Sequence, residues 1–119
     1  MSSGLRVTRE DRVALLVFDV PEKRNPLTES LMHEYAAAIE EIGSDDDVRA
    51  VVLASNGPAF SAGGDMKMLQ DQLSLPQEEN RRRMGRFYRR YLDALSLDVP
   101  TIAAIGGDAI GAGLTIALS

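Results

Sequence analysis

Two glycine-rich segments limit how this chain can fold: residues 59–67 (AFSAGGDMK) and residues 105–114 (IGGDAIGAGL). Each follows an apolar run and leads into a helical pattern, so each predicts a tight turn from a strand into a helix. Such turns present main-chain N–H groups with no partner inside the helix, and two of them converging on one point form an oxyanion hole. Taken singly, each segment is also explained by a turn in which glycine supplies positive φ or close packing.

The composition is typical of an ordinary soluble α/β protein. The 119 residues, 45% hydrophobic and 26% charged, suffice for one domain with a real core. The absence of cysteine excludes disulfides, thiolate zinc sites and a cysteine nucleophile. The longest apolar runs are shorter than the roughly 18 residues of a membrane span, and no apolar signal core follows the N-terminus. We therefore expect a cytoplasmic protein with no membrane partner, and the net charge of −5 argues against nucleic acid.

The hydrophobic pattern predicts strands that alternate with helices. Residues 5–9 and 13–19 are predicted to form a hairpin, and Thr28 is a suitable N-cap for a helix that ends at Gly43. The later elements are a strand at 50–54, a short helix from 66, a helix at 77–97, a strand at 99–105 and a helix at 114–119. The last pattern stops without a glycine cap, a proline or a polar tail, so we expect a truncated chain.

Four motifs resemble the crotonase (enoyl-CoA hydratase/isomerase) superfamily. Residues 60–67 are similar to its AF-x-AG-x-D-[LIM]-K segment, and residues 106–113 resemble its G-x-A-x-G-[GA]-G segment. The strand at 99–105 is similar to the family's [KR]-P-x-[IV]-A-A-[IV] strand, and residues 21–28 are similar to its R-x-N-[AP]-L-[ST] motif. The motifs follow the family order and cover practically the whole chain, which makes the resemblance specific.

The resemblance implies an α/β fold built as a spiral of ββα units. Residues 1–119 would be the N-terminal portion of a crotonase-like core domain, truncated before its C-terminal helical part. The implied substrate is an acyl-CoA thioester, with no separate cofactor, and its thioester oxygen would be held by the main-chain N–H groups of Gly64 and Ala112. The family's trimers further imply a homo-oligomer for a complete protein.

The same resemblance places a substrate pocket around the first glycine segment. Lys23, Arg24 and Lys67 are candidates for contacts with coenzyme A phosphates. The other implied pocket residues are Pro26, Ala62, Gly63, Asp65, Met66 and Gly111. For Asp65, a role as N-cap of the following helix is at least as well supported by its position. No metal site is predicted, because residues 45–47 lack the spaced ligands of a calcium loop.

One position departs from the family pattern. Hydratases of this family usually carry a glutamate two residues after the third glycine of the second segment, where this chain has Thr115. A threonine hydroxyl does not hold and return a proton near neutral pH as a carboxylate does. Water addition by two carboxylates is therefore not predicted, and an isomerase, a thioester hydrolase or a hydratase-like enzyme of altered activity remain. A non-catalytic interaction or scaffolding fragment is the alternative from another class.

Three further predictions concern weaker signals. The six arginines between residues 81 and 90 form either a patch for phosphates or for acids of another subunit, or a solvated helix face. A dinucleotide-binding module is disfavoured, because Ile116 stands where its fingerprint needs a third glycine or alanine. If a missing C-terminal half normally covers this part, the isolated chain should expose an apolar patch and associate.

Overall fold

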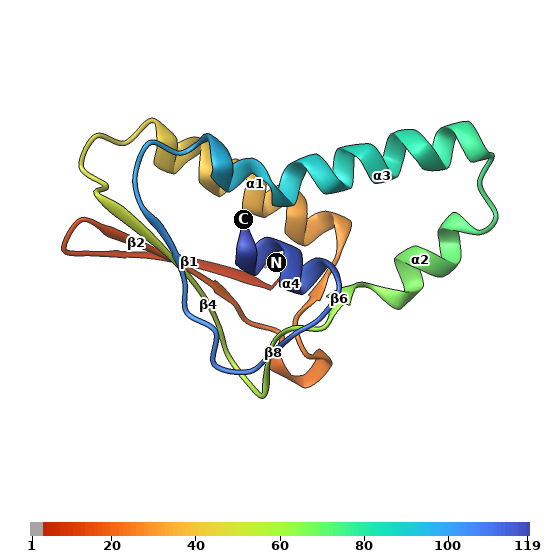
Figure 1. Ribbon diagram of the computed structural model, residues 1–119, viewed down its shortest axis with the longest axis horizontal. Helices are drawn as coiled ribbons and strands as arrows, with labels where there is room; N and C mark the ends of the chain where they lie inside the picture. Colours follow the sequence, from red (N-terminus) through yellow and green to blue (C-terminus); the bar gives the residue numbers. More distant parts are fainter. Residues whose placement is uncertain (1–3) are drawn as a thin grey trace.

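The computed structural model describes residues 4–119. Its main sheet has the strand order β1-β2-β4-β7, with β1 antiparallel to β2 and the other neighbours parallel (Figure 1). The strands are β1 (Leu5–Glu10), β2 (Val13–Phe18), β4 (Ala50–Ser55) and β7 (Thr101–Ala103). The predicted hairpin is confirmed, and Asp11 and Arg12 close it with φ of 49° and 68°, the sign that a two-residue turn between twisted strands requires.

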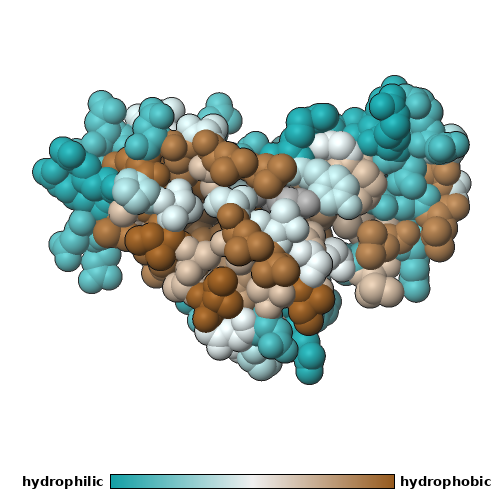
Figure 2. Space-filling view, in the orientation of Figure 1, coloured by the Kyte–Doolittle hydropathy of each residue, from teal (hydrophilic) through white to brown (hydrophobic). Residues whose placement is uncertain are grey.

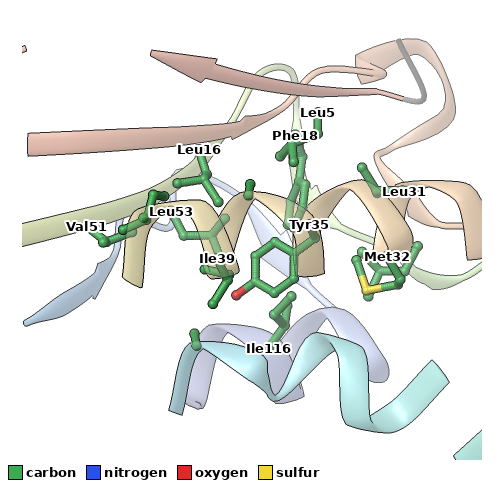
Figure 3. Packing of buried hydrophobic residues seen from close by; sticks show 14 of the residues in the cluster. Leu5, Leu16, Phe18, Leu31, Met32, Tyr35, Ile39, Val51, Leu53 and Ile116 are labelled. Atoms are coloured by element: carbon green, nitrogen blue, oxygen red, sulfur yellow. The ribbon is translucent and has the colours of Figure 1, made fainter. Parts of the chain in front are cut away.

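Helix α1 (Glu29–Gly43) packs its apolar side against the main sheet. It begins where the sequence predicts, because the Thr28 hydroxyl accepts the Leu31 N–H over 3.0 Å and caps the first turn. Phe18 of β2 lies at the centre of the core, with ring centroids 6.5 Å from Tyr35 and 5.6 Å from Phe60. Figure 3 shows how the buried side chains of α1 and the sheet meet, with Ile116 from the end of the chain among them.

The second half of the chain is mostly helical. It contains α2 (Met66–Gln72), α3 (Gln77–Tyr91), the 3₁₀ turn η2 (Asp93–Ser96) and α4 (Ala112–Leu118). The helix predicted at 77–97 thus ends at Tyr91. The Ser96 hydroxyl donates to the Asp93 carbonyl over 2.7 Å, a local bond that competes with a continuing helix. No helix within residues 4–119 is both long and apolar enough to cross a membrane.

Two small parallel sheets connect the segments that carry the motifs. The first pairs β3 (Pro26–Leu27) with β6 (Gly63–Gly64), and the second pairs β5 (Ala59–Ser61) with β8 (Asp108–Ala109). A 3₁₀ turn, η1 (Pro21–Lys23), precedes β3. None of these two- and three-residue strands was predicted. The strand expected at 99–105 is shorter, since β7 spans only Thr101–Ala103, and the last helix begins at Ala112 rather than at 114.

Apolar side chains are exposed around β7 and α4. Figure 2 shows apolar residues gathered across the middle of the face on which α4 lies. Ile102 of β7 is 52% exposed and Leu118 of α4 is 77% exposed. The remaining members of this apolar patch are Ile105, Ile110 and Leu114. The outer edge of β7 has no neighbouring strand among the described residues, so the expected apolar surface is present.

Candidate functional site

The two glycine-rich segments meet in the folded chain. Gly63 has φ of +96°, and a Cβ atom built on it would lie 2.8 Å from the carbonyl oxygen of Ile110 and 3.5 Å from the nitrogen of Ala112. These distances leave no room for a side chain at position 63. Figure 1 places α4 close to β6 and β8, in agreement with the packing of α4 against both strands. The convergence that the sequence predicts for the two segments is therefore found.

A second close approach seats the start of α4 on β5. A Cβ atom on Gly113 would lie 2.5 Å from the carbonyl oxygen of Ser61 and 2.8 Å from its Cβ. The Ile110 N–H donates to the same Ser61 carbonyl over 3.0 Å. Gly113 is therefore required for close packing, which is one of the two roles that the sequence left open for its glycine segment.

The main-chain amides of Ala112 and Gly64 occupy positions where no regular partner is available. Ala112 is the first residue of α4, so its N–H has no acceptor within the helix. Directly after β6, the N–H of Asp65 donates to the Leu27 carbonyl of β3 over 3.3 Å. Successive amides of an extended chain point to opposite edges, so the Gly64 N–H is directed away from β3. β6 has no second neighbouring strand in the described part of the chain, and α4 packs against it.

A set of buried hydrogen bonds made by the Asn25 side chain holds the loop before β3 in place. The sequence analysis did not predict these bonds. The Asn25 side chain is 1% exposed, donates to the carbonyls of Asn56 and Ala59 over 2.9 and 3.0 Å, and accepts the Val20 N–H over 2.8 Å. Asn25 also has φ of 53°, a conformation that asparagine tolerates better than most residues. Its position before Pro26 inside a recognised motif was the available signal.

Ser61 extends this connection to the first glycine segment. Its hydroxyl, fully buried, donates to the carbonyl of Asn25 over 2.8 Å and accepts the Gly63 N–H over 3.2 Å. The hydroxyl thus joins the loop before β3 to the turn that leads into β6. In the motif comparison Ser61 occupies a variable position, so the sequence did not single it out.

Several predicted pocket residues lie together beside this turn. Lys23, Pro26 and Asp65 line a cleft of about 790 Å³, the main cleft, which also borders the start of β1. Arg24 does not line it, because its left-handed backbone, with φ of 60°, separates it from Lys23. The Arg24 carbonyl instead accepts the N–H of Ala62 over 2.9 Å, so these two predicted residues hold the turn together through their main chains.

Lys67 lies in a neighbouring space. It lines a side hollow of about 220 Å³ that shares Asp65, Thr28 and Ser30 with the main cleft. The Asp65 carboxylate accepts the Met68 N–H over 3.1 Å and caps α2, which confirms the N-cap interpretation. Met66, the first residue of α2, is 68% exposed.

Thr115 has an exposed position on the first turns of α4. Its hydroxyl donates to the carbonyl of Gly111 over 3.3 Å, a bond to the preceding turn that many helical threonines make. Gly111, the N-cap of α4, has φ of 58°. Within residues 4–119, no group of three or more histidine or acidic side chains is arranged to hold a metal ion.

Comparisons with known proteins agree with the motif analysis. A family model described as enoyl-CoA hydratase/isomerase matches residues 8–119. The chain is 38% identical over 110 residues to a Mycobacterium tuberculosis protein named a probable enoyl-CoA hydratase. The matched region covers 92% of this chain and 42% of that relative. It is also 33% identical over 116 residues to a 4-chlorobenzoyl coenzyme A dehalogenase of an Arthrobacter species, again covering 42% of the relative.

Solved structures show the same similarity in three dimensions. A crystal structure of an enoyl-CoA hydratase from Shewanella pealeana superimposes with a TM-score of 0.89 at 26% sequence identity, over 95% of this chain and 43% of that chain. The chain therefore spans less than half the length of the proteins that it resembles.

Proposed function

The chain belongs to the enoyl-CoA hydratase/isomerase family and has the family's crotonase-type α/β fold, and from this we propose that the protein processes an acyl-CoA thioester. The main-chain N–H groups of Gly64 and Ala112 bind the thioester oxygen as it gains negative charge. One observation supports this most directly: a side chain on Gly63 would collide with the main chain beside Ala112, so the two turns meet at one place.

The physical basis of the proposal is preorganisation. An enolate-like thioester intermediate places negative charge on one oxygen, and two fixed N–H donors stabilise that charge without reorganising during the reaction. Ala112 stands at the N-terminus of α4, and the helix dipole also favours negative charge there. The small residues around both donors, Ala62, Gly63, Gly111 and Gly113, leave the acyl oxygen space to approach.

The coenzyme A part of the substrate is proposed to lie in the main cleft. Lys23 and Lys67 supply positive charge on either side of Asp65, in spaces that adjoin each other. Pro26 lines the main cleft beside Lys23, and Asp65 lines both the main cleft and the side hollow. The substrate itself carries the reactive thioester, so the proposal requires no further cofactor. A trimer-based assembly and a cytoplasmic location remain predictions for the complete protein.

The reaction class remains open within the family. Thr115 is no proton carrier near neutral pH, and its hydroxyl bonds to the Gly111 carbonyl. The acid or base is then supplied by another residue. An isomerase with one carboxylate, a thioester hydrolase and an altered hydratase all fit this arrangement. The name of the Arthrobacter relative, a dehalogenase, illustrates that relatives of this chain carry different reactions.

The proposal is tested by deleting one donor. Ala112 is the first helical residue of α4, a position where proline is well tolerated, so Ala112→Pro removes the N–H with little effect on the helix. We expect turnover of crotonyl-CoA or a 3-enoyl-CoA by the full-length protein to fall about 100- to 1,000-fold. Ala112→Gly keeps the N–H and serves as the matched control. Unchanged turnover in a folded Ala112→Pro protein contradicts the proposal.

The bond made by Thr115 also favours a second candidate, a non-catalytic crotonase-like interaction or scaffolding fragment. In that case the glycine segments maintain the fold and no acyl oxygen binds between them. The two candidates differ in one measurement on the purified 119-residue chain. Turnover of either thioester by this chain eliminates the second candidate.

A further inference from the structure

One face of α3 carries three arginines that point to a common space. Arg83, Arg86 and Arg90 follow one another at helical spacing and line a hollow of about 140 Å³ beside the first turn of α1. The other lining residues are Glu29 of α1 and Phe87, whose ring is buried below the surface. We call this space the arginine hollow.

The first of these arginines is fixed in place. A guanidinium nitrogen of Arg83 donates to both carboxylate oxygens of Glu29, over 3.0 and 3.2 Å. Its side chain is only 32% exposed, so the ion pair is partly shielded from water. The pair forms a wall shared by the arginine hollow and the side hollow that contains Lys67.

The other two arginines retain unused donors. Within residues 4–119, neither Arg86 nor Arg90 has a carboxylate within 4.0 Å. Arg90 interacts with Asp93 only at longer range: burial raises the pKa of the Asp93 carboxyl, and the positive charge of Arg90 opposes that shift. The lining residues thus carry three positive charges against the single negative charge of Glu29.

The remaining arginines of α3 provide a contrast on the same helix. Arg81 donates to Glu78 over 2.7 Å at an exposed position. Arg82 and Arg89 are exposed and do not line the arginine hollow. The excess of positive charge toward α1 therefore belongs to Arg83, Arg86 and Arg90, and the solvated-face interpretation of the arginine run applies to Arg81, Arg82 and Arg89.

We propose that the arginine hollow binds a phosphate group. Guanidinium groups are planar donors that match phosphate oxygens in pairs, and Arg86 and Arg90 still have such donors available. A volume of about 140 Å³ corresponds to roughly four or five water molecules, enough for a phosphate group but not for a whole nucleotide. The buried Phe87 ring limits hydration from below, which strengthens charge-assisted hydrogen bonds.

Two sources supply this chemistry: free inorganic phosphate, or the 3′-phosphate of a coenzyme A molecule whose other phosphates lie near Lys67. The two hollows share Glu29 and Arg83 as lining residues, so the arginine hollow lies next to the space that contains Lys67. The binding of phosphate itself does not rest on the acyl-transfer proposal, because a titration with inorganic phosphate involves no thioester.

The first experiment is a calorimetric titration of the full-length protein with inorganic phosphate at constant ionic strength. We expect saturable binding that weakens about tenfold in Arg86→Gln and in Arg90→Gln. Arg82→Gln and Arg89→Gln remove the same charge from the same helix and should change affinity less than twofold. Absence of saturable phosphate binding overturns the proposal. An equal loss of phosphate affinity in all four variants also overturns it, because it indicates a general electrostatic attraction to the helix and no specific site.

A variant that gains phosphate affinity provides a further test, because misfolding would lower the affinity. Glu29→Gln removes the carboxylate that occupies Arg83, so this variant should bind phosphate several-fold more tightly than the wild type. Weaker binding in a folded Glu29→Gln protein contradicts the proposed site.

The second experiment distinguishes the two sources by comparing coenzyme A with dephospho-coenzyme A, which lacks the 3′-phosphate. If Arg86→Gln weakens only coenzyme A binding, the bound group is the 3′-phosphate. If the variant affects inorganic phosphate alone, the site takes free phosphate. If the protein binds inorganic phosphate but neither coenzyme A nor dephospho-coenzyme A, the phosphate site is supported and the proposed acyl-CoA function is contradicted. Failure of one proposal can therefore be distinguished from failure of the other.

Discussion

The hydroxyl of Ser61 donates to the main-chain carbonyl of Asn25 over 2.8 Å, although 36 residues separate them in the sequence. Both side chains are buried, and the same hydroxyl accepts the N–H of Gly63. Gly113 packs directly on Ser61 from the other side. One small polar side chain therefore contacts three of the four segments that carry the family motifs.

Ser61→Ala should destabilise the protein by about 1–3 kcal/mol. The substitution removes the hydroxyl that bonds to the buried carbonyl of Asn25 and to the N–H of Gly63, and a buried unsatisfied polar group carries a penalty of that size. Urea unfolding followed by circular dichroism measures the change. Ser74→Ala is the control, because its hydroxyl also bonds to a carbonyl but at an exposed site. Equal effects of the two substitutions would falsify the structural role of Ser61.

Gly113→Ala should disturb the joint between α4 and β5. The new methyl group would lie 2.5 Å from the Ser61 carbonyl oxygen, so α4 must shift away from the sheet. Overpacking of this kind typically costs about 1–3 kcal/mol, and here it also moves the Ala112 amide. Thermal unfolding measures the first effect and thioester turnover the second. Gly106→Ala adds the same methyl group where no atom lies within 4 Å, and it should be nearly neutral.

Asp93→Asn should change how stability depends on pH. Burial raises the pKa of Asp93, Arg90 opposes this shift and Glu40 adds to it. Because the folded-state pKa is above the unfolded value, the folded chain binds this proton more tightly, and the resulting stabilisation at low pH is lost as the pH rises. The wild type should therefore lose more stability than Asp93→Asn over the pH range that begins at the ordinary aspartate pKa of about 4 and extends upward.

Urea midpoints at several pH values across that range test this prediction. Asp98→Asn, which replaces an exposed aspartate in the following segment, controls for the general loss of negative charge. Parallel pH profiles for the wild type and Asp93→Asn would show that Asp93 does not contribute as described.

The isolated 119-residue chain should self-associate at micromolar concentrations. Its apolar patch includes Ile110, 54% exposed, and Leu118, 77% exposed, and patches of this kind promote association. Sedimentation velocity should show oligomers whose share grows with concentration. The double variant Ile110→Ser/Leu118→Ser should shift the population toward monomer. A compact monomer at all concentrations of the unsubstituted chain is the contrary result.

Local signals were sufficient to predict the larger elements. The hairpin, α1 and β4 were expected close to their observed bounds, because each has a clear hydrophobic period and α1 has a capping residue at Thr28. The strands β3, β6 and β8 contain two residues each and exist only through pairing with distant segments. No local pattern predicts such strands, since their hydrogen bonds depend on the complete fold.

Only the outline of the candidate site could be predicted, because local sequence patterns identify turns but not long-range contacts. Glycine motifs identified the two turns, but the roles of Asn25 and Ser61 arise from burial and long-range hydrogen bonds that one sequence does not reveal. The family resemblance makes both Lys23 and Arg24 candidates for contacts with coenzyme A phosphates. The left-handed backbone of Arg24 then places the two residues in different surroundings, which is a conformational detail outside residue-type patterns.

The start of α4 has a practical consequence for mutational surveys. The main-chain N–H of Ala112 is retained whichever ordinary side chain replaces the methyl group. Among the standard amino acids only proline removes it, so a scan of substitutions at this position tests the N–H with one variant alone. Chemical synthesis that exchanges this single amide for an ester removes the hydrogen and keeps the methyl group. Such backbone editing, rather than residue scanning, is the method suited to testing the role proposed for this N–H group.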